Sequence, residues 1–165
     1  GIPTGTFGMT HEVAAEIAKK VDREVVDTGG IGGTLAGNAL SLASMRATLS
    51  QVLTADNFKK MIALADRWSD GVDAAIAEFK LPWHCNRLGA RGEYLFSPTA
   101  PRTGSEAAAA ADFELEQYIH LRLLNDGFLL TPFHNMALMS PVTTEADVDA
   151  HTAAFRKMAE EIASW

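Results

Sequence analysis

A glycine-rich stretch near the start of the chain holds the residue types best suited to bind a phosphate group. Residues 29–38 read Gly-Gly-Ile-Gly-Gly-Thr-Leu-Ala-Gly-Asn, and an apolar segment follows them. The free N–H groups and the partial positive charge at a helix N-terminus favour phosphate. Glycines let the backbone approach a ligand closely, and the hydroxyl of Thr34 can donate a further hydrogen bond. The stretch is neither a dinucleotide fingerprint nor a P-loop, and its alternative interpretation is a plain turn between two helices.

The histidine and cysteine residues do not predict a metal site. His11, His120 and His151 stand on predicted helices without a partner at ligand spacing. The single cysteine, Cys85, cannot form an intrachain disulfide or supply a zinc cluster alone. We interpret it as a small apolar residue buried on a strand, which fits the reducing environment of the cytoplasm.

Two motifs together resemble a known enzyme family. The chain opens with Gly-Ile-Pro-Thr-Gly-Thr-Phe-Gly, and residues 33–40 read Gly-Thr-Leu-Ala-Gly-Asn-Ala-Leu. In this order they resemble the class III aminotransferases, which are fold-type I enzymes that use pyridoxal 5′-phosphate (PLP). The resemblance is strongest to the branch that contains glutamate-1-semialdehyde aminomutase and β-amino-acid transaminases, and it extends in weaker form along the whole chain.

The resemblance implies where the cofactor would be held. Gly33 and Thr34 correspond to the family's phosphate-contacting pair, which reaches into the site of the neighbouring subunit, so a homodimer with shared sites is expected. The resemblance also implies that the lysine that binds PLP covalently would stand a few residues before Gly1. Lys19 and Lys20 do not fit this role, because both lie on a surface-type helix. The aspartate that pairs with the pyridine nitrogen would lie further upstream. No catalytic residue is therefore expected in this chain, which would act together with the N-terminal half of the same protein.

An amino-acid substrate needs a cation for its carboxylate, and the planar guanidinium of arginine suits that purpose best. Arg91, which opens a predicted strand, is the favoured candidate. Arg87 and Arg102 are the alternatives. Any one of the three can instead be a surface residue or part of a structural ion pair.

The turn at residues 131–136, Thr-Pro-Phe-His-Asn-Met, is the second candidate for substrate contact. His134 and Asn135 could line the mouth of a pocket, whereas a lone histidine can also be purely structural. In the aminomutase branch this turn carries a glutamate near the substrate, and the matching position here is Met136. This difference at position 136 favours transfer of an amino group between two molecules over its transfer within a single molecule.

We therefore expect a PLP-dependent aminotransferase that moves an amino group between an amino acid, such as a β-amino acid, and a keto acid. One alternative is an aminomutase of the glutamate-1-semialdehyde type, which moves the group within a single molecule. An alternative of another class is a non-catalytic α/β module, because the cofactor-binding lysine is not in this chain.

Hydrophobic periodicity predicts the elements that would position these residues. Residues 1–54 would form the incomplete C-terminal end of the large PLP-binding domain, and residues 55–165 a small α/β domain with helices on one side of a sheet. The fold class is α/β. The expected elements are a strand at 4–9, a helix from Thr10, a largely buried helix at 40–52, a long helix at 55–79, strands at 83–88 and 91–97, a helix at 106–125, strands at 128–131 and 136–140, and a helix from Thr144.

Composition limits the class of partner. The 165 residues carry a net charge of −7 with 47% hydrophobic residues, as in globular proteins. The negative charge makes a nucleic acid or an anionic membrane a poor partner. No apolar run approaches the roughly 20 residues that span a bilayer.

Overall fold

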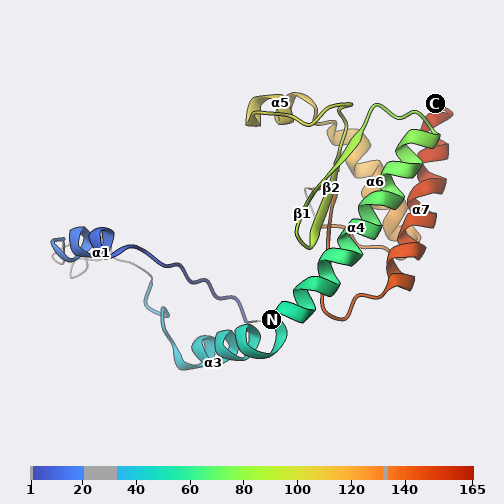
Figure 1. The fold of residues 1–165 in the computed structure, drawn as a ribbon. Coiled ribbons are helices and arrows are strands. Elements are labelled where there is room, and N and C mark those ends of the chain that lie inside the picture. Colours follow the sequence, from blue (N-terminus) through green and yellow to red (C-terminus); the bar gives the residue numbers. More distant parts are fainter. Residues whose placement is uncertain (1, 21–32, 132–133) are drawn as a thin grey trace. The chain divides into compact units, whose positions relative to one another are not determined.

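The computed structural model describes residues 2–20, 33–131 and 134–165. Contacts divide the chain into two units, Gly1–Thr54 and Ala55–Trp165, each with its own elements (Figure 1). The first unit contains α1 (His11–Ala18), α3 (Ala39–Ala47) and the π-helical turn η1 (Thr48–Val52). The second contains, in order, α4 (Ala55–Glu78), β1 (His84–Leu88), β2 (Arg91–Leu95), α5 (Gly104–Ala109), α6 (Phe113–Asn125), β3 (Met136–Leu138) and α7 (Glu145–Ala163).

In the first unit, the predicted start of a helix at Thr10 is confirmed. The hydroxyl of Thr10 accepts a hydrogen bond from the backbone N–H of Val13, and α1 begins at His11. The strand predicted for residues 4–9 is wrong, because this segment has no sheet partner among the described residues. A strand depends on a neighbour that pairs its backbone groups, and the described part of this unit offers none.

Helix α3 and the turn η1 cover the predicted helix at 40–52, but they differ from the prediction in burial. Neither element has a buried residue, and Leu40 is 65% exposed. The expected burial on most sides is therefore wrong for the chain as described. Apolar side chains on this helix need a covering surface, which the described residues of the unit do not supply.

The second unit begins with the long helix that periodicity predicts. Helix α4 presents one apolar face to the core and ends before Pro82 as expected. Lys80 adopts a positive φ of 54°, and Leu81 donates its N–H to the carbonyl of Ile76 over 3.0 Å, which closes the last turn. The buried residues of α4 are Met61, Leu64, Ala65, Trp68, Ser69, Val72, Ala75 and Ile76.

The predicted hairpin is confirmed. Strands β1 and β2 are antiparallel and join at Gly89, whose φ of 58° suits a tight turn. Strand β3 pairs with the other edge of β2, and Arg91, Gly92 and Glu93 face Leu138, Ala137 and Met136. The strand predicted at 128–131 is wrong, since these residues form a loop and β3 is confined to residues 136–138.

The prediction of a single helix at 106–125 is also wrong, because two helices, α5 and α6, occupy this segment. Asp112 lies between them, and its carboxylate accepts the N–H of Leu115 over 3.0 Å. An aspartate at this position caps a new helix start, which ends the alanine-rich helix before it. The predicted cap at the end of α6 is confirmed, with Gly127 at a φ of 93°.

Helix α7 starts at a capping box formed by Thr144 and Asp147. It packs along α4, and two ion pairs cross the contact, from Arg67 to Asp149 over 2.7 Å and from Arg156 to Glu78. Helices α4, α6 and α7 lie to one side of the hairpin (Figure 1). No helix in the described part of the chain is long and apolar enough to cross a membrane.

The core lies between the sheet and these helices. Tyr94 on β2 is fully buried and contacts the rings of Trp68, Trp83 and Phe155. Gly92 is required for this close approach, since a Cβ at that position would lie 2.6 Å from the ring of Trp68. The opposite face of β2 therefore carries Arg91, Glu93 and Leu95.

Candidate functional site

The predicted phosphate-binding pair lies in a tight turn that leads into α3. Ala36 donates its N–H to the carbonyl of Gly33 over 2.8 Å, and Gly37 has a φ of 68°. The side chain of Asn38 then accepts the N–H of Ser41, which starts the helix. The remaining glycines of the predicted loop, residues 29–32, lie outside the described residues.

Gly33 and Thr34 are both exposed. A Cβ built on Gly33 meets nothing within 4 Å, and the hydroxyl of Thr34 makes no hydrogen bond in the part of the chain that the structure describes. A glycine with open space beside it and an exposed hydroxyl are compatible with the donor chemistry that a phosphate group uses. The contact of Gly33 and Thr34 with a cofactor phosphate stays a prediction.

Two of the three residues predicted to contact a substrate lie together. Nη2 of Arg91 donates to Oε2 of Glu93 over 2.6 Å, and Nδ1 of His134 lies 3.2 Å from Oε1 of the same carboxylate. The side chain of Glu93 is 17% exposed, against 47% for Arg91 and 54% for His134. Glu93 was not among the predicted site residues, although its position two residues after Arg91 on a strand places both side chains on one face.

Asn135, the third predicted residue, is 5% exposed and turns toward α6. Its Nδ2 lies 3.5 Å from Oε1 of Glu116, and its backbone carbonyl accepts the N–H of Tyr94 over 3.1 Å. Nε2 of His120 lies 3.0 Å from the carbonyl of His134. The turn is therefore anchored by α6 on one side and by β2 on the other. Pro132 and Phe133, at its tip, lie outside the described residues.

The alternative arginines do not join this cluster. Nη1 of Arg87 lies 3.3 Å from Asp66 and 3.2 Å from Asp70, so its side chain pairs with α4. The backbone N–H of Arg102 donates to Glu106 over 2.7 Å, which places Arg102 at the start of α5. Among the described residues, no group of histidine, cysteine and carboxylate side chains could hold a metal ion.

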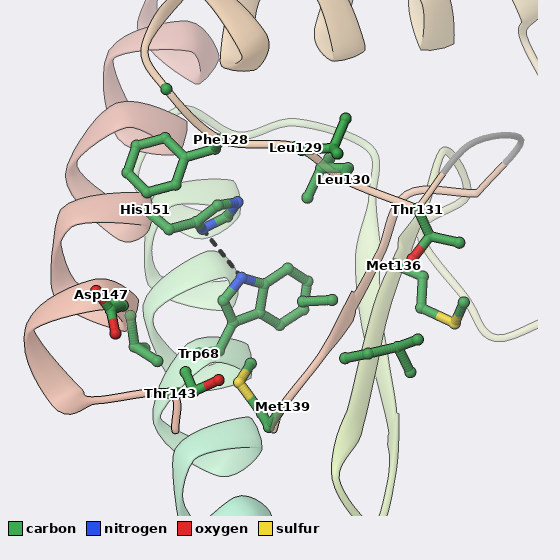
Figure 2. A pocket seen from close by; sticks show the side chains of 14 residues that line it. Trp68, Phe128, Leu129, Leu130, Thr131, Met136, Met139, Thr143, Asp147 and His151 are labelled. Carbon is green, nitrogen blue, oxygen red and sulfur yellow. Dashed lines mark hydrogen bonds between the residues drawn. The ribbon is translucent and has the colours of Figure 1, made fainter. Parts of the chain in front are cut away.

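A cavity of about 380 Å³ lies on the helical side of the domain, where Trp68 and His151 meet the loop that follows α6 (Figure 2). Nε1 of Trp68 donates to Nδ1 of His151 over 3.0 Å, so the imidazole proton is on Nε2, which has no partner in the described chain. Burial lowers the pKa of His151 to about 4. Thr131 and Met136 border the cavity and flank the predicted substrate turn. The side chain of Met136 points away from Trp68 (Figure 2), and the cluster around Glu93 lies outside the cavity.

Cys85 lies on β1 as predicted, but it is half-buried and packs against the core rather than being buried in it. Burial raises the pKa of its thiol to about 11, so the thiol is protonated at neutral pH and is a poor nucleophile.

Known proteins resemble this chain over nearly all of its length. It is 32% identical to a glutamate-1-semialdehyde 2,1-aminomutase from Staphylococcus carnosus across 98% of this chain and 36% of that protein. It is 30% identical to the corresponding protein from an Anaeromyxobacter species across 94% of this chain and 35% of that protein. The chain therefore spans about a third of the length of the curated relatives it matches. No family model matches it.

Solved structures agree with this relationship. A crystal structure of a glutamate-1-semialdehyde aminomutase variant from Pseudomonas aeruginosa, in complex with PMP, is 52% identical with a TM-score of 0.78. The match covers 80% of this chain and 29% of the other. A β-phenylalanine aminotransferase from Variovorax paradoxus, 24% identical over 82% of this chain and 31% of that chain, has the same fold with a TM-score of 0.67. The resemblance to class III aminotransferases is thus confirmed, and the chain is homologous to a C-terminal portion of these proteins.

Proposed function

We propose that this chain is part of a PLP-dependent aminotransferase that moves an amino group between an amino acid, such as a β-amino acid, and a keto acid. The observation that carries the proposal is the exposed turn at Gly33 and Thr34, in a chain 52% identical to an aminomutase that binds PMP. PLP, when bound, supplies the electron sink of such a reaction.

The residues of this chain would bind and orient the reactants. Gly33 and Thr34 would hold the phosphate through backbone and hydroxyl donors. Arg91 would bind the carboxylate of the substrate, because nearly half of its side chain is exposed and only one of its terminal nitrogens contacts Glu93. His134 and Asn135 would shape the turn beside it.

We further propose a homodimer in the cytoplasm. In the family, the pair that matches Gly33 and Thr34 reaches the neighbouring subunit's site, so each site would need two copies of the protein. A single half-buried cysteine suits a reducing compartment. The segment that supplies the cofactor-binding lysine would be the N-terminal half of the same protein.

The second candidate function is an aminomutase of the glutamate-1-semialdehyde type, which the names of the relatives favour. Met136, at the position of the glutamate in the aminomutase branch, favours the transaminase. Incubating the PLP-loaded enzyme with an amino donor and either pyruvate or 2-oxoglutarate separates the two. We expect net formation of alanine or glutamate; isomerisation of an amino aldehyde without any amino transfer to a keto acid would contradict the transaminase.

Thr34 gives the sharpest test of the cofactor site. Replacing Thr34 with alanine removes one hydrogen bond to a charged group, which is worth about 1.5–3 kcal/mol. We expect the dissociation constant for PLP to rise by roughly one to two orders of magnitude, as measured by equilibrium titration of the apoenzyme. Thr34→Ser retains the hydroxyl and should stay close to the parent. Equal affinity in the alanine variant would remove Thr34 from the cofactor site.

A further inference from the structure

The face of the sheet opposite α4, α6 and α7 brings Glu93 beside Met136. Gly92 and Tyr94 on β2 point toward the helices, where they contact Trp68. Glu93 therefore points to the other face, and the register places it directly opposite Met136 on β3. Opposite residues of an antiparallel pair lie on the same face with their Cβ atoms about 5 Å apart. Glu93 thus places a carboxylate directly beside Met136.

Glu93 also holds the two exposed residues that would meet a substrate. Each carboxylate oxygen has its own partner, with Arg91 at 2.6 Å and His134 at 3.2 Å. Glu93 is the least exposed of the three, so it lies beneath the groups it contacts. A second carboxylate, that of Glu116, lies 3.5 Å from Nδ2 of Asn135 in the same turn.

This arrangement distinguishes substrates by their number of carboxylates. The contact with Glu93 uses one terminal nitrogen of Arg91, which leaves other N–H groups for one carboxylate of a substrate. A second substrate carboxylate near Arg91 would approach Glu93, and like charges a few ångströms apart repel strongly in a partly buried site. Repulsion of an unwanted ligand is a common way to achieve specificity.

We propose that Glu93 is a specificity-determining residue that makes the site favour substrates with a single carboxylate over dicarboxylates. The inference rests on the proposed aminotransferase function, whose substrate class it narrows. Glu93 acts through its charge and through the position it gives Arg91.

The test compares Glu93→Gln with Glu93→Asp in the PLP-loaded enzyme that carries this chain. The amide has the size of the original side chain but lacks its charge, whereas aspartate keeps the charge. In the glutamine variant we expect kcat/KM for 2-oxoglutarate to rise about tenfold relative to that for pyruvate. The aspartate variant should retain the parent preference within about twofold. Glu160→Gln on α7, on the helical side of the sheet, is the matched control and should leave the preference unchanged.

Calorimetry gives a second readout that does not require turnover. Glutarate and butyrate, a dicarboxylate and a monocarboxylate, serve as probes, and we expect Glu93→Gln to tighten glutarate binding about tenfold relative to butyrate. Equal shifts for both probes, or equal effects of the glutamine and aspartate variants, would overturn the assignment. If the parent enzyme transfers no amino group to either acceptor, the proposed function fails, while the ratio of the two dissociation constants still decides the role of Glu93.

Discussion

The imidazole of His151 illustrates how burial decides the chemistry of a single residue. Its Nδ1 accepts the indole N–H of Trp68, and the residue is 6% exposed between aromatic neighbours. Protonation would add a charge in an environment that cannot hydrate it. The pKa of the folded state, about 4, therefore lies below the ordinary value of 6.5.

This difference predicts how stability depends on pH. Between these two pKa values the unfolded chain binds a proton that the folded chain does not, so unfolding becomes easier as the pH falls. We expect the free energy of unfolding to decrease by about 2 kcal/mol between pH 7 and pH 5. Urea denaturation across that range measures it.

The control for this prediction is His151→Gln, which can still accept the indole N–H but does not titrate. Its free energy of unfolding should be nearly flat over the same range, whatever its absolute value. A slope equal to that of the parent would assign the pH dependence to other groups.

Residue types at the candidate site could be predicted from the sequence, but their partners could not. Gly33 and Thr34 follow from a motif, and Arg91 and His134 from their chemistry and neighbours. The spacing of Glu93 from Arg91 indicates that they share a face, but its place beside Met136 depends on the register of β2 against β3. The side-chain direction of Asn135 depends on Glu116, nineteen residues away on another element.

At the scale of elements, Gly71 sets how closely α4 and α7 can pack. Glycine inside a helix normally costs about 1 kcal/mol relative to alanine. Here a Cβ would lie 2.6 Å from Cγ2 and 2.7 Å from Oγ1 of Thr152 on α7. Because threonine is stiff at χ1, the two helices would have to move apart.

We therefore expect Gly71→Ala to destabilise the protein by about 1–3 kcal/mol, despite the better helix propensity of alanine. Chemical denaturation provides the measurement. Thr152→Ala in the same chain should recover most of the loss, because it removes the atoms that clash. If Gly71→Ala alone stabilises the protein, the interhelical contact is looser than described.

Elements with strong local signals could be predicted, and those that depend on distant partners could not. Helix α4 has a regular apolar period, the hairpin has Gly89 at its turn, and α7 has a capping box. The break between α5 and α6 arises because Asp112 caps the start of α6, although the alanine-rich sequence before it favours a continuous helix. The segments at 4–9 and 128–131 lack a partner strand among the described residues, which no local pattern can reveal.

At the scale of the whole molecule, the two units differ in how much apolar surface they bury. The second unit contains a continuous core centred on Trp68, Tyr94 and Phe155. In the first unit, no described residue is buried, and side chains such as Phe7 and Leu40 are exposed. Among the described residues, the second unit therefore has the buried surface that stabilises an independent fold, and the first does not.

We expect residues 55–165, expressed alone, to unfold in a single cooperative transition, with near-UV and far-UV circular dichroism changing together. A peptide of residues 1–54 should show no cooperative transition, because its described residues form no core. A truncated second unit that keeps its far-UV signal but lacks a near-UV signal would contradict this independence.

The pairing of α4 with α7 has a consequence for synthesis on the ribosome. The contacts between these helices, among them Arg67 with Asp149 and Trp68 with His151, join residues about eighty positions apart. Contacts of such long sequence separation form late in folding. Helix α4 therefore leaves the ribosome with its apolar face uncovered. Helix α7 can pack against that face only after most of the unit has been translated. During that interval the nascent chain is prone to aggregation. Slower translation of residues 80–145 would lengthen the interval.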